Sequence, residues 1–272
     1  PAAVEVDVPQ VSLLAPEVAS SLSARAMALS NGMRRIVAIH AMQASLGPTS
    51  TAMQNCWPEA KLINLCDDSL SVDVELTGLD QSMDDRFEAL TAYAKNHMQA
   101  DGVLWSCSAF GSCIEKAANI HSTIPVLKPN EAMQEQIVSP ENGGASLVLS
   151  MFEPTLPSIE RELFQLAQAK NVPLELELAF VEDALAAKNG GELDKSANMI
   201  ADRAVELWAR RVEREPERAG KGKGTVALAM FSMAFAKSVT EAKLEAAFPG
   251  AAPPVLTSPD SAVMKLRSLI EG

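Results

Sequence analysis

Short apolar segments alternate with segments of helical periodicity along most of this 272-residue chain. In the first half, four runs rich in Val, Ile and Leu end in small or polar residues: RRIVAIHAM (34–42), AKLINLCDD (60–68), GVLWSC (102–107) and IPVLKP (124–129). Between them, apolar residues recur at helical spacing, as in the segment 83–99. Strands that alternate with helices form parallel sheets through βαβ crossovers. The pattern predicts an α/β fold with four parallel strands in this half.

The same order returns after about residue 140. Further apolar runs predict strands at 145–152, 174–180, 225–232 and near 255, with helices at 153–170 and 193–214 between them. We therefore expect two pseudo-duplicated lobes, each with a mostly parallel four-stranded sheet flanked by helices. A single doubly wound sheet with incidental similarity is the alternative.

Three pairs of segments match in the same order. The Ala-Phe pairs at 109–110 and 234–235 align with a shift of 125 positions, which puts Cys107 opposite Ser232. Two further pairs are Pro-Val-Leu at 125–127 with 254–256, and HAMQASLGPT with LSMFEPTLPS, the latter at a shift of 109 that puts Met42 opposite Met151. These matches predict a first lobe at 34–138 and a second at 139–272. Residues 1–33 would be an arm that packs on the body or, in a homodimer, on a neighbouring subunit.

Composition narrows the classes of function. The formal charge of −12 argues against nucleic acid or an anionic membrane as partner. No apolar run approaches the roughly 20 residues that span a bilayer, and the first residues lack the basic and apolar regions of a secretory signal. The four cysteines have neither disulfide nor metal-ligand spacing. We expect a cytoplasmic protein without a bound metal.

The turn that follows the third strand is the strongest candidate site. Cys107 ends that strand, and Ser108 and Ala109 are small enough for backbone N–H groups to approach an anion. In a parallel sheet, ligands bind beyond the carboxyl ends of the strands. The start of the next helix adds partial positive charge, which favours a thiolate. The turn therefore predicts a reactive thiol beside a carboxylate site, in a crevice between the two lobes.

Seven segments resemble the aspartate/glutamate racemase superfamily, which includes hydantoin racemases, maleate isomerases and arylmalonate decarboxylases. They are IVAIHA, NLCDDSLSVD, CSAFG, VLKPNEAM, FEPTLPS, FSMA and VLTSPDSAV. The resemblance covers most of residues 34–270 and implies two facing lobes and a cofactor-independent enzyme acting on a small carboxylate or dicarboxylate. In two-base members a cysteine from each lobe flanks the substrate's α-carbon. Cys107 matches the first of these cysteines.

The second lobe departs from that pattern with Ser232. A serine hydroxyl is a far poorer acid or base near neutral pH than a thiol, and the neighbouring Met230 and Met233 exchange no proton. One thiol suffices for decarboxylation, or for cis-trans isomerisation with Cys107 as nucleophile; racemisation needs a substitute base such as His40, Asp67, Asp68 or Glu153. A catalytically inactive small-carboxylate-binding or regulatory protein is the rival from another class.

The resulting prediction is proton transfer at the carbon next to a carboxylate, with one cysteine. Catalytic candidates are Cys107, Ser232 and His40. Candidates for substrate binding lie at strand ends and helix starts: Gln43, Asp67, Ser69, Ser108, Ala109, Phe110, Asn130, Thr155, Met233 and Thr257.

Overall fold

The computed structural model describes residues 32–139, 145–214 and 224–272. The chain divides into two compact units, Pro1–Arg34 and Arg35–Gly272, and all that follows concerns the second. The predicted arm at 1–33 lies almost wholly outside the described residues, as does most of the charged loop that the sequence places after the helix at 193–214.

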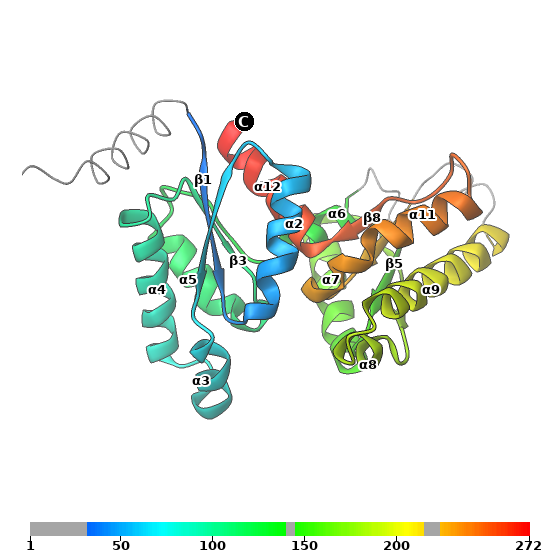
Figure 1. The fold of residues 1–272 in the computed structure, drawn as a ribbon, viewed down its shortest axis with the longest axis horizontal. Helices are drawn as coiled ribbons and strands as arrows, with labels where there is room; N and C mark the ends of the chain where they lie inside the picture. The colour runs from blue at the N-terminus through cyan, green and yellow to red at the C-terminus, as the bar shows by residue number, and fades with distance from the viewer. Residues whose placement is uncertain (1–31, 140–144, 215–223) are drawn as a thin grey trace, which may run out of the picture. The chain divides into compact units, whose positions relative to one another are not determined.

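Two parallel four-stranded sheets form the body, which confirms the predicted fold class (Figure 1). The first has the order β2-β1-β3-β4: β1 (Arg35–His40), β2 (Lys61–Cys66), β3 (Gly102–Trp105) and β4 (Val126–Leu127). The second has the order β6-β5-β7-β8: β5 (Ala145–Ser150), β6 (Glu175–Phe180), β7 (Thr225–Leu228) and β8 (Val255–Thr257). The two orders are equivalent, as a duplicated lobe requires.

Helices follow the strands in both lobes. Those of the first half are α2 (Leu46–Cys56), α3 (Ser69–Thr77), α4 (Gln81–Asn96), α5 (Gly111–Ile120) and α6 (Glu131–Ile137). Those of the second half are α7 (Leu156–Lys170), α8 (Ala184–Asn189), α9 (Leu193–Arg214), α11 (Lys237–Ala247) and α12 (Ser258–Glu271). The sequence analysis does not separate α3, α6 and α8, each of nine residues or fewer, from the turns beside them.

Ladder hydrogen bonds define which residues of the two lobes correspond. Val103 N donates to Pro125 O at 2.9 Å, and Val226 N donates to Pro254 O at 3.0 Å, so the Pro-Val-Leu pairs match as predicted. The first strands differ by one residue from the sequence alignment. Ser106 N donates to Ile39 O and Ala229 N to Leu149 O, which gives a shift of 110 positions (149 − 39) instead of 109. Met42 therefore corresponds to Phe152 and not to Met151.

Each lobe gives its last helix to the other lobe. The first sheet packs α4 and α5 on one face, through Phe87 and Ile114, and α2 and α12 on the other, through Met53 and Leu266 (Figure 1). In the second sheet, α8, α9 and α11 pack on one face, and α7 and α6 pack on the other. Thus α6, which follows β4, packs on the second sheet, and α12, which follows β8, packs on the first. The predicted division at 138/139 remains a prediction, because the two cores share these helices.

Candidate active site

The turn after β3 has the geometry that the sequence predicts. Cys107 is extended (φ −124°, ψ 119°) and precedes a 3-10 turn, Ser108–Phe110, that leads directly into α5. Ser108 and Ala109 are exposed and Cys107 is half-buried. The backbone N–H of Ala109 points at the Cys107 sulfur, so this thiol sits against the start of a helix.

The corresponding turn of the second lobe follows β7. Met230 is extended (φ −89°, ψ 138°) and precedes the 3-10 turn Phe231–Ala236. The β-ladders equate Val103 with Val226, so Cys107 corresponds to Met230, a shift of 123 positions (230 − 107). The sequence alignment is therefore wrong by two residues here, and Ser232 corresponds to Ala109. Hydrogen-bond register sets this correspondence, whereas the shared Ala-Phe pairs lie beyond the strands and lack that constraint.

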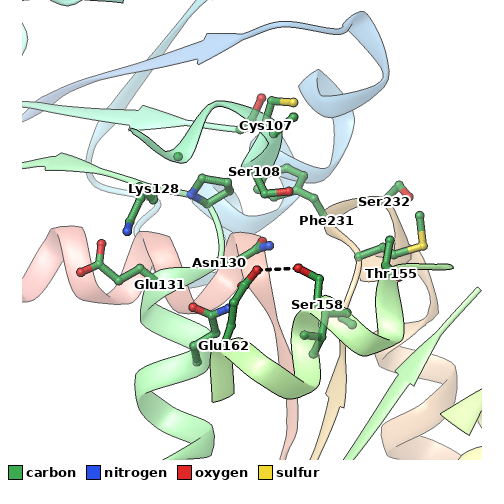
Figure 2. A pocket seen from close by; sticks show the side chains of 18 of the residues that line it. Cys107, Ser108, Lys128, Asn130, Glu131, Thr155, Ser158, Glu162, Phe231 and Ser232 are labelled. Atoms are coloured by element: carbon green, nitrogen blue, oxygen red, sulfur yellow. Dashed lines mark hydrogen bonds between the residues drawn. The ribbon is translucent and has the colours of Figure 1, made fainter. Parts of the chain in front are cut away.

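Both turns line one cavity of about 880 Å³ (Figure 2). The first lobe contributes the turn at 106–111 and residues of the segment 128–135, which directly follows β4 and includes most of α6. The second lobe contributes Thr155, one face of α7 and the turn at 229–232. In Figure 2, Cys107 and Ser108 come from one lobe, and Thr155, Ser158 and Ser232 from the other. Cys107 thus opens onto a space that both lobes enclose.

Carboxylates outnumber cations among the residues that line this cavity. Four are glutamates, and the one cation, Lys128, pairs with Glu115. Glu131 and Glu135 contact Lys265 at 3.6 and 2.9 Å, while Glu162 accepts hydrogen bonds from Gln134 and Ser158 at 2.7 and 3.0 Å. Attraction for an anionic ligand must therefore come from the N–H groups that begin the helices at the two turns.

Burial raises the pKa of the Cys107 thiol, and the Ala109 N–H opposes that effect without overcoming it. A raised pKa favours the neutral thiol, whereas the sequence predicted a stabilised thiolate. The cause is that the half-buried sulfur loses more solvation than one backbone donor restores. Cys107 therefore rests as a thiol, which is a proton donor.

No family model matches the chain, and no curated protein matches it. Solved structures do match. A putative Asp/Glu racemase from Yersinia pestis superposes with a TM-score of 0.58 at 12% identity, covering 88% of this chain and 100% of the other.

Two enzymes of different reaction classes match over the same extent. Allantoin racemase from Klebsiella pneumoniae has a TM-score of 0.56 at 15% identity, with 88% of each chain covered. Unliganded arylmalonate decarboxylase has a TM-score of 0.51 at 13% identity, with 88% of this chain and 94% of the other covered. The chain has the aspartate/glutamate racemase fold. At these identities the match concerns the fold alone, and the reaction must be argued from the site.

Six of the predicted site residues of this racemase-fold chain line the cavity: Cys107, Ser108, Ala109, Asn130, Thr155 and Ser232. Three others are structural. Phe110 packs against Phe87 in the first core, Met233 is fully buried in the second, and the Thr257 side chain accepts from Asp260 N at the start of α12.

Gln43, Asp67 and Ser69 lie in a separate polar cluster and do not line the cavity. Arg86 pairs with Asp67 at 2.7 Å, Ser69 donates to the same carboxylate at 2.7 Å, and Gln43 donates to Asp68 at 2.9 Å. Burial opposes ionisation of Asp67, but the hydrogen bonds from Ser69 and Arg86 outweigh it and lower the pKa. Held by Arg86, the Asp67 carboxylate is a poor substitute base.

His40 is fully buried behind the cavity wall and does not line the cavity. Its Nδ1 lies 2.9 Å from Ser106 Oγ, and its Nε2 lies 3.0 Å from Asn64 Oδ1. Burial lowers the pKa of His40, and the Asn64 hydrogen bond opposes this only in part. The imidazole is therefore neutral at pH 7, and it reaches the cavity only through Ser106.

Several residues of the cavity wall are not among the candidates predicted from the sequence. Ser106 lines the cavity directly before Cys107, and Glu162 lies one helical turn after Ser158 on the same face of α7. The i, i+4 spacing of Ser158 and Glu162 within the helix predicted at 153–170 is the sequence signal that places both residues on one face. Glu131 and Gln134 lie on α6, whose packing on the second lobe has no local signal.

The rest of the described chain offers no metal centre and no membrane span. Within residues 32–139, 145–214 and 224–272, no group of three His, Cys, Asp or Glu side chains could hold a metal ion. No helix in these ranges is both long and apolar enough to cross a membrane.

Proposed function

We propose that this chain is a cofactor-independent enzyme that moves a proton at the carbon next to a carboxylate of a small acid, with Cys107 as the acid or base. The observation that carries the proposal is the position of Cys107. It lies two residues beyond the parallel strand β3, takes a hydrogen bond from Ala109 N–H, and faces a cavity that a second, equivalent turn also lines. Solved structures with this fold include racemases and a decarboxylase, so the fold accommodates both reactions.

The raised pKa of Cys107 favours proton donation. In decarboxylation the bond to the leaving carboxylate breaks, its electron pair stays on the α-carbon, and the Cys107 thiol gives that carbon a proton. In racemisation a base first removes the α-proton and Cys107 returns one. Isomerisation by addition of Cys107 to an alkene needs a thiolate, which burial disfavours. We therefore rank decarboxylation and racemisation above it.

The lack of a thiol in the second turn favours one rival function, the binding of small carboxylates without turnover. Met230 stands where a second cysteine would complete a two-thiol site, and it exchanges no proton. A protein that binds small carboxylates without turning them over would have this arrangement as well.

Proton exchange in deuterated water separates enzyme from binding protein. Dicarboxylates, amino acids, hydantoins and 2-aryl malonates would be followed by NMR with the native protein, with Cys107→Ala, and with Cys66→Ala as a matched control. Cys66 is exposed and does not line the cavity. We expect deuterium at the α-carbon of one compound, or a deuterated decarboxylation product, lost only in Cys107→Ala. Ligand binding without exchange in any of the three proteins would instead assign the binding function.

A further inference from the structure

A hydrogen-bonded chain of three side chains leads from the cavity wall to the protein surface in the first lobe. Ser106 is 3% exposed and lines the cavity, His40 is fully buried behind it, and Asn64 is exposed on the edge strand β2. The contacts are 2.9 Å from Ser106 Oγ to His40 Nδ1 and 3.0 Å from His40 Nε2 to Asn64 Oδ1. His40 and Asn64 lie on the adjacent strands β1 and β2, and Ser106 directly follows β3, the neighbour of β1 on the other side.

The partners define the proton positions. An amide oxygen only accepts hydrogen bonds, so His40 Nε2 carries the proton and donates to Asn64. His40 Nδ1 is then an acceptor, and the Ser106 hydroxyl must donate to it. Asn64 thereby holds the imidazole in the tautomer that can take the hydroxyl proton. Serine hydrolases activate a hydroxyl by the same principle, with the two ring nitrogens exchanged and a carboxylate in place of the amide.

The second lobe indicates that the fold does not require this chain of polar groups. The ladders place Ser150 where the first lobe has His40, Leu178 where it has Asn64, and Ala229 where it has Ser106. Leu178 and Ala229 pack in an apolar core, and the Ser150 hydroxyl contacts only its own turn, through Phe152 and Thr155. Burying polar groups costs free energy, and the second lobe forms the same sheet with Leu178 and Ala229 in place of Asn64 and Ser106. The fold therefore does not require the three polar side chains, and buried polar groups beside a cavity, such as Ser106 and His40, are candidates for a functional role.

Resting on the proposed function, we propose that Ser106 is the second proton-transfer group of this cavity, with His40 as its proton acceptor and Asn64 as the positioning residue. The substrate's α-proton moves to Ser106 Oγ while the Ser106 hydroxyl proton moves to His40 Nδ1. The electron pair of the broken C–H bond stays on the substrate, conjugated with its carboxylate. For racemisation, the Cys107 thiol then gives a proton to the same carbon, leaving a thiolate and an imidazolium. After product release, the imidazolium loses its proton to water and the thiolate takes one from water, which restores both groups.

Strand geometry directs the side chains of Ser106 and Cys107 toward opposite faces of the first sheet. Successive residues of a strand point to opposite faces, and Cys107 packs with the core that contains Trp105, whereas Leu104 packs in the core on the other face. Ser106 therefore points away from the face that holds Cys107. The neutral imidazole and the protonated thiol match the base and acid roles of this step.

The test measures α-proton exchange of the compound that the native protein turns over. Ser106→Ala should slow exchange about 10²- to 10⁴-fold, the usual contribution of a general base, while Ser106→Thr, which keeps a hydroxyl, should retain most of the rate. Ala stands at the equivalent position 229, so the variant should fold. Ser146→Ala is the matched control, because it removes a buried hydroxyl bonded to Thr225 in the second lobe, outside the cavity.

The positioning role of Asn64 is tested by measuring which tautomer the His40 imidazole adopts. Asn64→Leu should shift the ring ¹⁵N resonances of His40 away from the Nε2–H tautomer and slow exchange, and Asn64→Asp should restore both. If the native protein exchanges protons through Cys107 and Ser106→Ala does so at an unchanged rate, the relay is wrong and the proposed function stands. A Cys107-dependent decarboxylation product without α-proton exchange would overturn the relay and leave the proposed function standing. If the native protein gives neither α-proton exchange nor a deuterated decarboxylation product, both fail together.

Discussion

Cys107 and Met230 occupy the same position in two copies of one turn, the last extended residue before a 3-10 helix. One lobe has a thiol there and the other a thioether, so the two halves of the cavity have different chemistry. The two turns therefore supply one thiol to the cavity at these equivalent positions, and under the proposed function a second proton carrier would come from elsewhere in the wall.

Alkylation should confirm this register. In a Cys107→Ala background, Met230→Cys should place a thiol in the cavity, and Met233→Cys should place one in the second core, where Met233 is fully buried. We expect iodoacetamide to label position 230 and to leave position 233 unlabelled, as measured by peptide mass spectrometry. Equal labelling of the two positions would contradict the shift of 123.

The alkylation rate of Cys107 should depend steeply on pH. Because burial raises the thiol pKa above the reference value of 9.0, the reactive thiolate is scarce at pH 7 and increases up to and beyond pH 9. The rate constant, followed for the peptide that carries Cys107, should therefore rise about tenfold per pH unit between pH 7 and 8.5. A rate that is already constant from pH 7 upward would mean that the helix start stabilises the thiolate after all.

His40 should make the protein less stable in mild acid. Its folded-state pKa is lowered from 6.5, so as the pH falls below 6.5 the unfolded chain gains a proton before the folded chain does. This contribution is present above pH 6.5 and is lost as pH falls, by at most about 1.4 kcal/mol per pH unit. Urea unfolding at pH 7, 6 and 5 should show a smaller loss for His40→Gln. Equal losses of unfolding free energy in the native protein and in His40→Gln would refute the assignment of this pH dependence to His40.

The buried ion pair at the start of α12 should be costly to break. Lys237 Nζ lies 2.6 Å from Asp260 Oδ2, and the Asp260 side chain is only 7% exposed. Lys237→Met leaves that carboxylate without its cation and should lower the free energy of unfolding by about 3 kcal/mol. The exposed pair of Lys243 and Asp202, also at 2.6 Å, is the control, since Lys243→Met should cost less than about 1 kcal/mol in the same denaturant titration.

Two glycines should respond in opposite directions to alanine. Gly224 has φ +129°, and a Cβ there would lie 2.8 Å from both Ala145 O and the Trp208 ring. Gly224→Ala should therefore destabilise the protein by about 2 to 3 kcal/mol. Gly47 lies in α2 with open space around it, so Gly47→Ala should stabilise by about 0.5 to 1 kcal/mol. Thermal and urea unfolding of the two variants would check both signs.

The alternation of strands and helices was sufficient to predict both sheets, because buried parallel strands need continuous apolar runs and their crossovers need amphipathic helices. The turn at Cys107 followed from the same pattern, since small residues after a buried strand are a local signal. The correspondence of residues between the two lobes was predicted less well beyond the ends of the strands. There the aligned Ala-Phe pairs misplaced the second turn by two residues, and only the ladder hydrogen bonds correct it.

The sequence by itself determined two duplicated α/β lobes, with a lone thiol at the end of one strand. Only the tertiary structure decided that α6 and α12 cross between the lobes, that Glu162 joins the wall, and that Ser106, His40 and Asn64 form one hydrogen-bonded chain. The physical reason is the range of the interactions. Periodicity reports contacts within a few residues, whereas the trio joins strands that lie 24 to 66 positions apart, and that juxtaposition exists only in the folded sheet.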